Sequence, residues 1–358
     1  MKTSLRPAAT PSPQRRARPR ANDRPYPKTR PSGQNPRRQF LHLAAGAAAV
    51  PAVSCIVSAQ TYPTRPITMI VPYPPGGPTD FVGRVVAERM KGLLRQPIII
   101  ENIAGADGTI GIGRAARARP DGYTIGLGEQ STLVFNGAFF SLQYDVLNDF
   151  TPISPLVTTY ALLFARKSIP ANDLKELIAW LRANPNKASA GIAGSSYNLG
   201  TTLFQKETGT KFTLVPYRGT APAMQDLVGG QIDMMFNAPN QLPLARAGSI
   251  TAYAVTSERR LALAPDIPTF AEMGLPALSR TAWSGLFAPR DTPSDIVGRL
   301  NAAAVEALAD PAVRSRFIEL GYEVFSRERQ TPEVLGALQK ADAEKWWPII
   351  KALGLKAE

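Results

Sequence analysis

Residues 70–81 read Ile-Val-Pro-Tyr-Pro-Pro-Gly-Gly-Pro-Thr-Asp-Phe. Because an apolar run at 67–71 leads into this stretch and an amphipathic run to Lys91 follows it, the pattern predicts a strand, a glycine loop and a helix. The first N–H groups of a helix lack internal partners and carry partial positive charge. Adjacent glycines let a ligand approach the backbone closely. The stretch therefore predicts a carboxylate or phosphate site, with an ordinary turn capped by Thr79 or Asp80 as the alternative.

The charge of the chain is concentrated at its N-terminal end. The whole sequence of 358 residues has 41 Lys and Arg, 28 Asp and Glu, and a formal charge of +13. Residues 1–59 hold 11 of the basic residues and one acidic residue, which leaves 30 basic and 27 acidic residues in the rest. A nucleic-acid-binding domain needs clustered basic charge on its folded part. The near-balance after residue 59 therefore argues against a nucleic-acid partner.

Residues 1–59 have the order of parts found in an exported leader. Residues 1–36 are rich in Pro and Arg with little to bury, so we expect them to be disordered. Arg37-Arg38, an apolar run and Val57-Ser58-Ala59 follow in turn. This arrangement is similar to a twin-arginine export signal, and it predicts cleavage after Ala59 and a periplasmic location. An N-terminal membrane anchor is the alternative, but about 20 apolar residues are needed to span a bilayer.

The only His and the only Cys, His42 and Cys55, both lie in this leader. After cleavage the chain would have neither, which excludes Ser–His–Asp and Cys–His catalysis and any zinc site with His or Cys ligands. We therefore expect no metal and no cofactor. Cys55 is either a lipidated cysteine or a spectator in the apolar run.

The chain after Gln60 alternates strand-like and helix-like patterns. This alternation predicts an α/β fold with largely parallel strand pairing. Strands are expected at 67–71, 97–101, 124–128, 162–165, 188–192, 213–217, 232–236, 252–256 and 284–288. Helices are expected at 80–94, 110–118, 172–183, 197–208, 221–228, 269–273, 294–308, 311–320 and 331–353.

Further polar loops follow other predicted strands. A second loop of small and hydroxyl-bearing residues at a predicted helix N-terminus is Gly194-Ser195-Ser196-Tyr197-Asn198. Two such loops could clamp an anionic ligand from both ends. Ser131 and Asn237 follow two more strands and could add polar contacts. Each segment has a simpler alternative, a helix cap or a tight turn.

Eight segments in order resemble the Bug receptors, the periplasmic solute-binding proteins of tripartite tricarboxylate transporters. The resemblance covers essentially all of residues 61–358. The most extended segments are Val71-Pro-Tyr-Pro-Pro-Gly-Gly-Pro-Thr-Asp80, Glu101-Asn-Ile-Ala-Gly-Ala-Asp-Gly-Thr-Ile-Gly111, Val215-Pro-Tyr-Arg-Gly-Thr-Ala-Pro-Ala223 and Asp226-Leu-Val-Gly-Gly-Gln-Ile-Asp233.

The resemblance implies a two-lobed type II periplasmic binding protein fold with a ligand cleft between the lobes. Lobe one would comprise residues 61–162 and 283–358, and lobe two residues 163–282. Carried onto this chain, the family's ligand contacts would fall on Tyr73, Gly76, Gly77, Thr79, Asp80, Ser195, Ser196, Asn198 and Asn237. We expect Asp80 to shape its loop rather than touch the ligand as a bare anion.

Three positions depart from the family pattern. Many relatives have His where Asn198 stands and Asp where Asn237 stands, and Asp107 replaces a residue that is commonly small. The contacts to the far end of the ligand therefore differ, so no relative's ligand is carried over.

The function expected from the resemblance is capture of a small organic carboxylate for delivery to membrane transporter subunits, by a protein that is a monomer and not an enzyme. The alternatives are a ligand sensor that reports to a partner protein, and a periplasmic enzyme acting on a carboxylate.

Overall fold

The computed structural model describes residues 62–356, which belong to the second of two units, 1–56 and 57–358. The predicted export signal with Arg37 and Arg38, its cleavage after Ala59, and Cys55 lie outside the described residues. Within them, no helix is both long and apolar enough to cross a bilayer.

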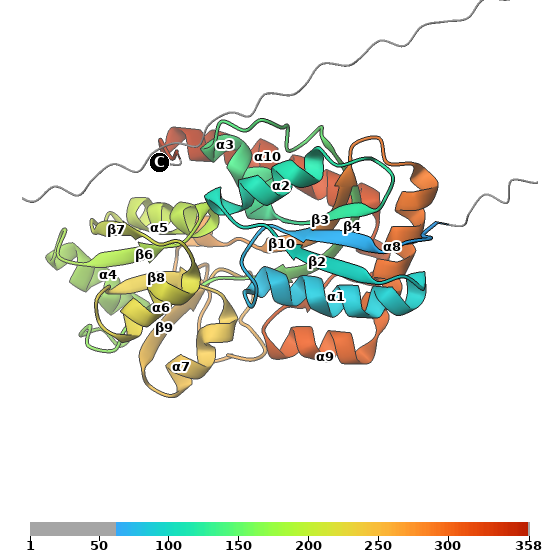
Figure 1. The fold of residues 1–358 in the computed structure, drawn as a ribbon. Helices are drawn as coiled ribbons and strands as arrows, with labels where there is room; N and C mark the ends of the chain where they lie inside the picture. The colour runs from blue at the N-terminus through green and yellow to red at the C-terminus, as the bar shows by residue number, and fades with distance from the viewer. Residues whose placement is uncertain (1–61, 357–358) are drawn as a thin grey trace, which may run out of the picture. The chain divides into compact units, whose positions relative to one another are not determined.

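The first lobe is built on a six-stranded sheet in the order β11-β4-β10-β3-β1-β2 (Figure 1). Its strands are β1 (Ile67–Val71), β2 (Ile98–Asn102), β3 (Thr124–Glu129), β4 (Phe150–Thr159), β10 (Ala282–Pro289) and β11 (Glu323–Val324). The second lobe is built on a five-stranded sheet in the order β7-β6-β8-β5-β9. Its strands are β5 (Leu162–Arg166), β6 (Ser189–Ile192), β7 (Thr213–Pro216), β8 (Met234–Asn237) and β9 (Ile250–Val255).

The expectation of largely parallel pairing is wrong. Among the described strands, four pairings are parallel and five are antiparallel. The antiparallel pairings all involve β4, β5, β9, β10 or β11. The chain passes from one sheet to the other between β4 and β5 and again between β9 and β10, so these strands do not follow the helix-crossover rule that makes neighbours parallel.

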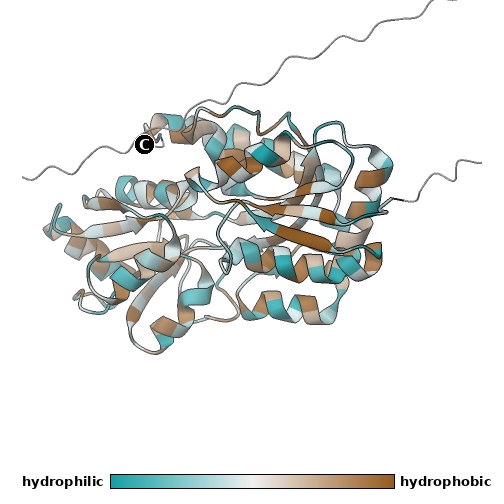
Figure 2. Cartoon of the chain, viewed as in Figure 1, coloured by the Kyte–Doolittle hydropathy of each residue, from teal (hydrophilic) through white to brown (hydrophobic). Residues whose placement is uncertain are grey.

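Helices cover both faces of the first sheet. On one face, α1 (Pro78–Leu94) packs with α8 (Ser294–Ala309) and α9 (Pro311–Glu319) around Val82, Val86 and Met90. These α1 residues recur every three to four positions, which places them on one helix face. The other face is covered by α2 (Thr109–Ala116), α3 (Asn136–Phe139) and α10 (Pro332–Ala352). Figure 2 shows the polar residues of α1 interleaved with apolar ones, as an amphipathic helix requires.

The second sheet is covered in the same way. On one face, α4 (Leu174–Ala183) and α5 (Ser195–Thr208) bury Leu177 and Phe204. On the other, α6 (Thr220–Val228) and α7 (Leu242–Arg246) pack in a separate apolar cluster that includes Leu227 and Leu242. Side-chain caps begin several helices, because Asp173 accepts from Glu176 N and Thr331 accepts from Val334 N.

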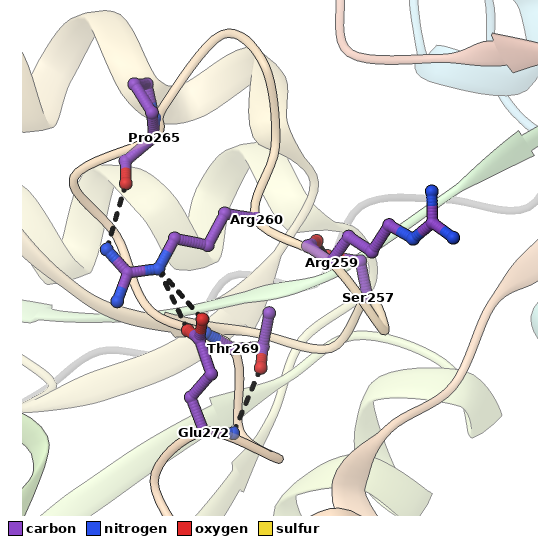
Figure 3. Close-up of polar contacts among 6 residues, drawn as sticks. All are labelled: Ser257, Arg259, Arg260, Pro265, Thr269 and Glu272. Atoms are coloured by element: carbon purple, nitrogen blue, oxygen red, sulfur yellow. Dashed lines mark hydrogen bonds and ion pairs between the residues drawn. The ribbon is translucent and has the colours of Figure 1, made fainter.

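The predicted helix at 269–273 is a turn. Thr269 Oγ1 accepts from Glu272 N, and Glu272 Oε2 accepts from Thr269 N, so the two residues close a reciprocal capping box. Arg260 reaches both carboxylate oxygens of Glu272 and the carbonyl of Pro265, which holds the turn against the preceding loop (Figure 3). The box signals a helix start, but Gly274 and Pro276 end the segment after one turn.

Candidate ligand-binding site

The loop after β1 has the predicted strand–loop–helix arrangement, but α1 begins earlier than expected. The helix starts at Pro78 with Gly77 as its N-cap, and no side chain caps it. The alternative of a cap by Thr79 or Asp80 is therefore wrong. Gly76 has φ +80, which favours glycine, whereas Gly77 has φ −79, which does not.

Asp80 is buried and shapes this loop. Its carboxylate accepts hydrogen bonds from Gly76 N at 2.9 Å, Arg84 Nε at 2.8 Å and Asn102 Nδ2 at 2.9 Å. Burial by itself would raise the pKa of Asp80, but the hydrogen bonds from Arg84, Gly76 and Asn102 outweigh it and lower the pKa below its ordinary value. All the contacts of this carboxylate are internal, so its role here is to order the loop.

A hydrogen-bonded network joins the first loop to the end of β3. Thr79 Oγ1 donates to Glu129 Oε1 at 2.5 Å, and Ser131 Oγ lies 3.4 Å from Glu129 Oε2. Tyr73 Oη lies 3.3 Å from Ser131 Oγ. Ser131 begins a π-helical turn, Ser131–Phe135, a distortion that is frequent at functional sites. Three of the predicted side chains, Tyr73, Thr79 and Ser131, are thus brought together.

The pKa of Glu129 is raised in this network. Desolvation, with a smaller contribution from nearby Asp107, raises the pKa of Glu129 to about 7, against the opposing hydrogen bonds from Thr79 and Ser131. Burial also raises the pKa of Asp107. The structure thus brings two carboxyl groups into one network.

The network reaches the second lobe through Asp107. Its Oδ2 accepts from Ser195 N at 2.9 Å and lies 2.7 Å from Ser195 Oγ, at the first residue of α5. Its Oδ1 lies 3.4 Å from Tyr73 Oη. A carboxylate at the N-terminus of a helix meets unpaired N–H groups and the positive end of the helix dipole. The α5 loop therefore holds a carboxylate, and that carboxylate belongs to the protein.

Asn136 fixes both partners of this contact. Its Nδ2 donates to the backbone carbonyl of Asp107 at 2.8 Å, and its Oδ1 lies 2.9 Å from Ser195 Oγ. A serine hydroxyl has one proton and two neighbouring acceptors here. The Ser195 hydroxyl can therefore donate to Asp107 or to Asn136, but not to both at once.

The remaining predicted side chains are placed outside this network. Ser196 Oγ accepts from Arg280 Nη2 at 3.1 Å. Asn198 Oδ1 accepts from Thr202 one turn along α5. Asn237 ends β8, is 2% exposed, and its Oδ1 accepts from Ala238 N. Among the described residues, Asn237 Nδ2 and Arg280 Nη1 have no hydrogen-bond partner.

Sequence reasoning missed Glu129, Asn136 and Arg280 as members of the site. Glu129 lies next to the predicted strand 124–128 and could have been found as a charged residue at a strand end. Asn136 and Arg280 carry no local signal, because only the fold brings them to α5. Two hollows in the described part of the structure, of about 300 and 280 Å³, are lined by none of the ten predicted residues.

No group of three or more His, Cys, Asp or Glu side chains within residues 62–356 is placed to hold a metal ion. The site consists of hydroxyls, amides, two carboxyl groups, one buried guanidinium and two helix N-termini. Such groups can bind and orient a small polar molecule.

Comparison with known proteins agrees with this architecture. The family described as the tripartite tricarboxylate transporter family receptor matches residues 82–355. Protein BugT of Bordetella pertussis is 35% identical over 309 residues, which cover 85% of this chain and 94% of BugT. The structure of MatC from Rhodopseudomonas palustris with bound malate is 38% identical, with a TM-score of 0.76 over 81% of this chain and all of MatC.

Two further solved structures are similar. The periplasmic binding protein BugD is 37% identical with a TM-score of 0.77 over 83% of this chain and all of BugD. An R. palustris protein solved with adipate is 31% identical with a TM-score of 0.77, again over 83% of this chain and all of that protein. The fold is that of the two-lobed periplasmic solute-binding proteins. This chain belongs to the tripartite tricarboxylate transporter receptor family, the Bug receptors.

Proposed function

We propose that this protein captures a small organic carboxylate between its two lobes in the periplasm and delivers it to a tripartite tricarboxylate-type transporter. Family membership supports the receptor role, and the malate and adipate in the similar structures support the ligand class. The observation that carries the proposal is the contact at Ser195, where the N-terminus of α5 already binds a carboxylate group.

The organisation that goes with this function is also part of the proposal. Residues 1–59 act as a leader that is cleaved after Ala59, residues 61–162 and 283–358 form lobe one, and residues 163–282 form lobe two. The ligand meets Tyr73, Gly76, Gly77, Thr79 and Ser131 from lobe one, and Ser195, Ser196, Asn198 and Asn237 from lobe two. The protein acts as a monomer and meets the transporter subunits once its lobes have closed.

The first test is thermal unfolding of the purified protein against mono-, di- and tricarboxylates, amino acids and aromatic acids. A ligand at 100 times its Kd adds about 2.7 kcal/mol to the free energy of unfolding. For a domain of this size that corresponds to a rise in Tm of roughly 4 °C. If no carboxylate raises Tm, including after denaturation and refolding to remove any ligand carried through purification, the proposal is wrong.

The two carboxyl groups of the network make an enzymatic role the competing function, because such pairs also serve acid–base catalysis. The same experiment separates the two. A carboxylate that raises Tm is incubated with the protein and followed by NMR. A receptor returns it unchanged, whereas steady turnover would assign the site to an enzyme.

A further inference from the structure

The loop that carries Asp107 has an uncommon backbone. Gly105, Ala106, Asp107 and Gly108 have φ values of +129, +46, +50 and +84. Residues with side chains avoid this region. Such a conformation persists only where surrounding contacts hold it. Here those contacts are the hydrogen bond from Asn136 to the Asp107 carbonyl and the contacts of the Asp107 carboxylate with Ser195.

The carboxylate of Asp107 fills the position in front of α5. An ideal Cβ at Gly194, the N-cap of α5, would lie 2.5 Å from Asp107 Oδ1. Both hydrogen-bond donors of Ser195, its N–H and its hydroxyl, already face Asp107 Oδ2. A second carboxylate could bind these donors only after Asp107 had moved away.

Charge in the network adds to this exclusion. Glu129 is the next acidic group, joined to Asp107 through Ser131 and Tyr73. Among the described residues, neither Asp107 nor Glu129 forms an ion pair with a Lys or Arg side chain. An anionic group entering here would meet two acidic groups without a direct counter-charge, whereas an ammonium or another hydrogen-bond donor would be stabilised.

We infer that Asp107 acts as a built-in occupant of the carboxylate position at α5 and selects against ligands that carry a second carboxylate at that end. The inference rests on the proposed receptor function and deepens it. The ligand class is then a monocarboxylate whose far end donates hydrogen bonds, such as an ω-amino acid, rather than a dicarboxylate.

The test compares ligands of equal length that differ only at one end, adipate against 6-aminohexanoate and succinate against 4-aminobutanoate. Kd values are measured by titration calorimetry for the unchanged protein, Asp107→Gly and Asp107→Asn. Glycine suits the positive φ of this position, so the first variant removes the carboxylate without new backbone strain. The second keeps the size and removes the charge.

We expect Asp107→Gly to bind at least one of the two dicarboxylates at least tenfold more tightly than the unchanged protein, with no such gain for the amino acid of equal length. Asp107→Asn should shift the same ratio in the same direction by a smaller factor. Asp291→Gly is the matched control, because Asp291 also has positive φ (+63) but its side chain is 81% exposed and pairs only with Arg290. It should leave every Kd unchanged.

The inference is wrong if Asp107→Gly gains no affinity for either dicarboxylate, or gains equally for both members of each pair. If the unchanged protein binds a carboxylate but Asp107→Gly shows no selective gain, the inference about Asp107 is wrong and the proposed receptor function stands. Absence of binding by all proteins to every carboxylate tested would overturn the proposed function as well.

Discussion

Ala161 and Thr256 are joined by a two-way hydrogen bond. Thr256 N donates to the carbonyl of Ala161 at 2.9 Å, and Ala161 N donates to Thr256 Oγ1 at 3.0 Å. Ala161 lies between β4 and β5, and Thr256 follows β9, so the bond ties together the two places where the chain passes between the sheets. Both residues are buried. A pair in this position holds the two connecting segments in register.

Thr256→Val should therefore destabilise the protein. Valine keeps the shape but leaves the buried N–H of Ala161 without an acceptor, at a cost of about 1–3 kcal/mol. Urea unfolding measures the change. Thr158→Val is the control, since its side chain is only partly buried and its hydroxyl lies 3.5 Å from Glu323 O, so the change should stay within about 0.5 kcal/mol. Equal effects for the two variants would show that the bond to Ala161 contributes nothing.

Glu129 should give the stability a distinct pH dependence. Its pKa rises from 4.5 to about 7 on folding, so the folded protein binds more protons between these values. Stability from this group is therefore full below pH 4.5 and falls as pH rises to about 7, by at most about 3 kcal/mol. The groups that act on it include Thr79, Ser131 and Asp107, and the phenols of Tyr73, Tyr197 and Tyr322 lie near enough to interact with its charge.

Glu129→Gln removes this titration. The difference in unfolding free energy between the unchanged protein and the variant should change with pH between 4.5 and 7 and be flat above that range. Denaturant unfolding at several pH values measures it. Parallel curves for the two proteins across this range would show that Glu129 does not have a raised pKa.

Gly194→Ala should disturb the contact between Asp107 and Ser195. The added methyl group would lie 2.5 Å from Asp107 Oδ1, and φ +90 disfavours any side chain. We expect a loss of more than about 1 kcal/mol in unfolding free energy. Gly77→Ala serves as the control, because its φ is −79 and the nearest atom to its Cβ is Pro74 O at 3.6 Å. Thermal and urea unfolding measure the loss of stability in both variants. Equal losses for Gly194→Ala and Gly77→Ala would contradict the close contact between Gly194 and Asp107.

Asp80→Asn should weaken the first loop. The carboxylate of Asp80 now accepts from the N–H groups of Gly76, Arg84 and Asn102. The asparagine NH2 group is itself a donor and would face one of these donors, which should lower the free energy of unfolding by about 1–3 kcal/mol. Because folding lowers the pKa of Asp80, its contribution is present above the unfolded value of 3.8 and is lost as pH falls below it. The difference between the two proteins should thus shrink in acid. Asp291→Asn, at an exposed ion pair, should change the free energy of unfolding by less than about 0.5 kcal/mol. If Asp291→Asn destabilises the protein as much as Asp80→Asn does, the loss at Asp80 does not come from its three hydrogen bonds.

The sequence by itself determined the local units and the family. The apolar run, glycine loop and amphipathic helix from Ile67 to Leu94 could be predicted because strand and helix periodicity, helix propensity and backbone freedom are properties of neighbouring residues. The predicted loops at Gly76 and Gly194 both lead into helices for the same reason. β4, the longest strand at ten residues, was missed because Pro152 and Pro155 interrupt its pattern.

Only the tertiary structure decided which side chains meet. Asp107 and Ser195 are 88 positions apart, and Asn136 reaches both from a third segment. No local pattern could show that Asp107 lies at the N-terminus of α5, because that contact depends on how the lobes meet and on four consecutive positive φ angles. The raised pKa of Glu129 has the same origin, since desolvation is a property of the packed site and not of the residue.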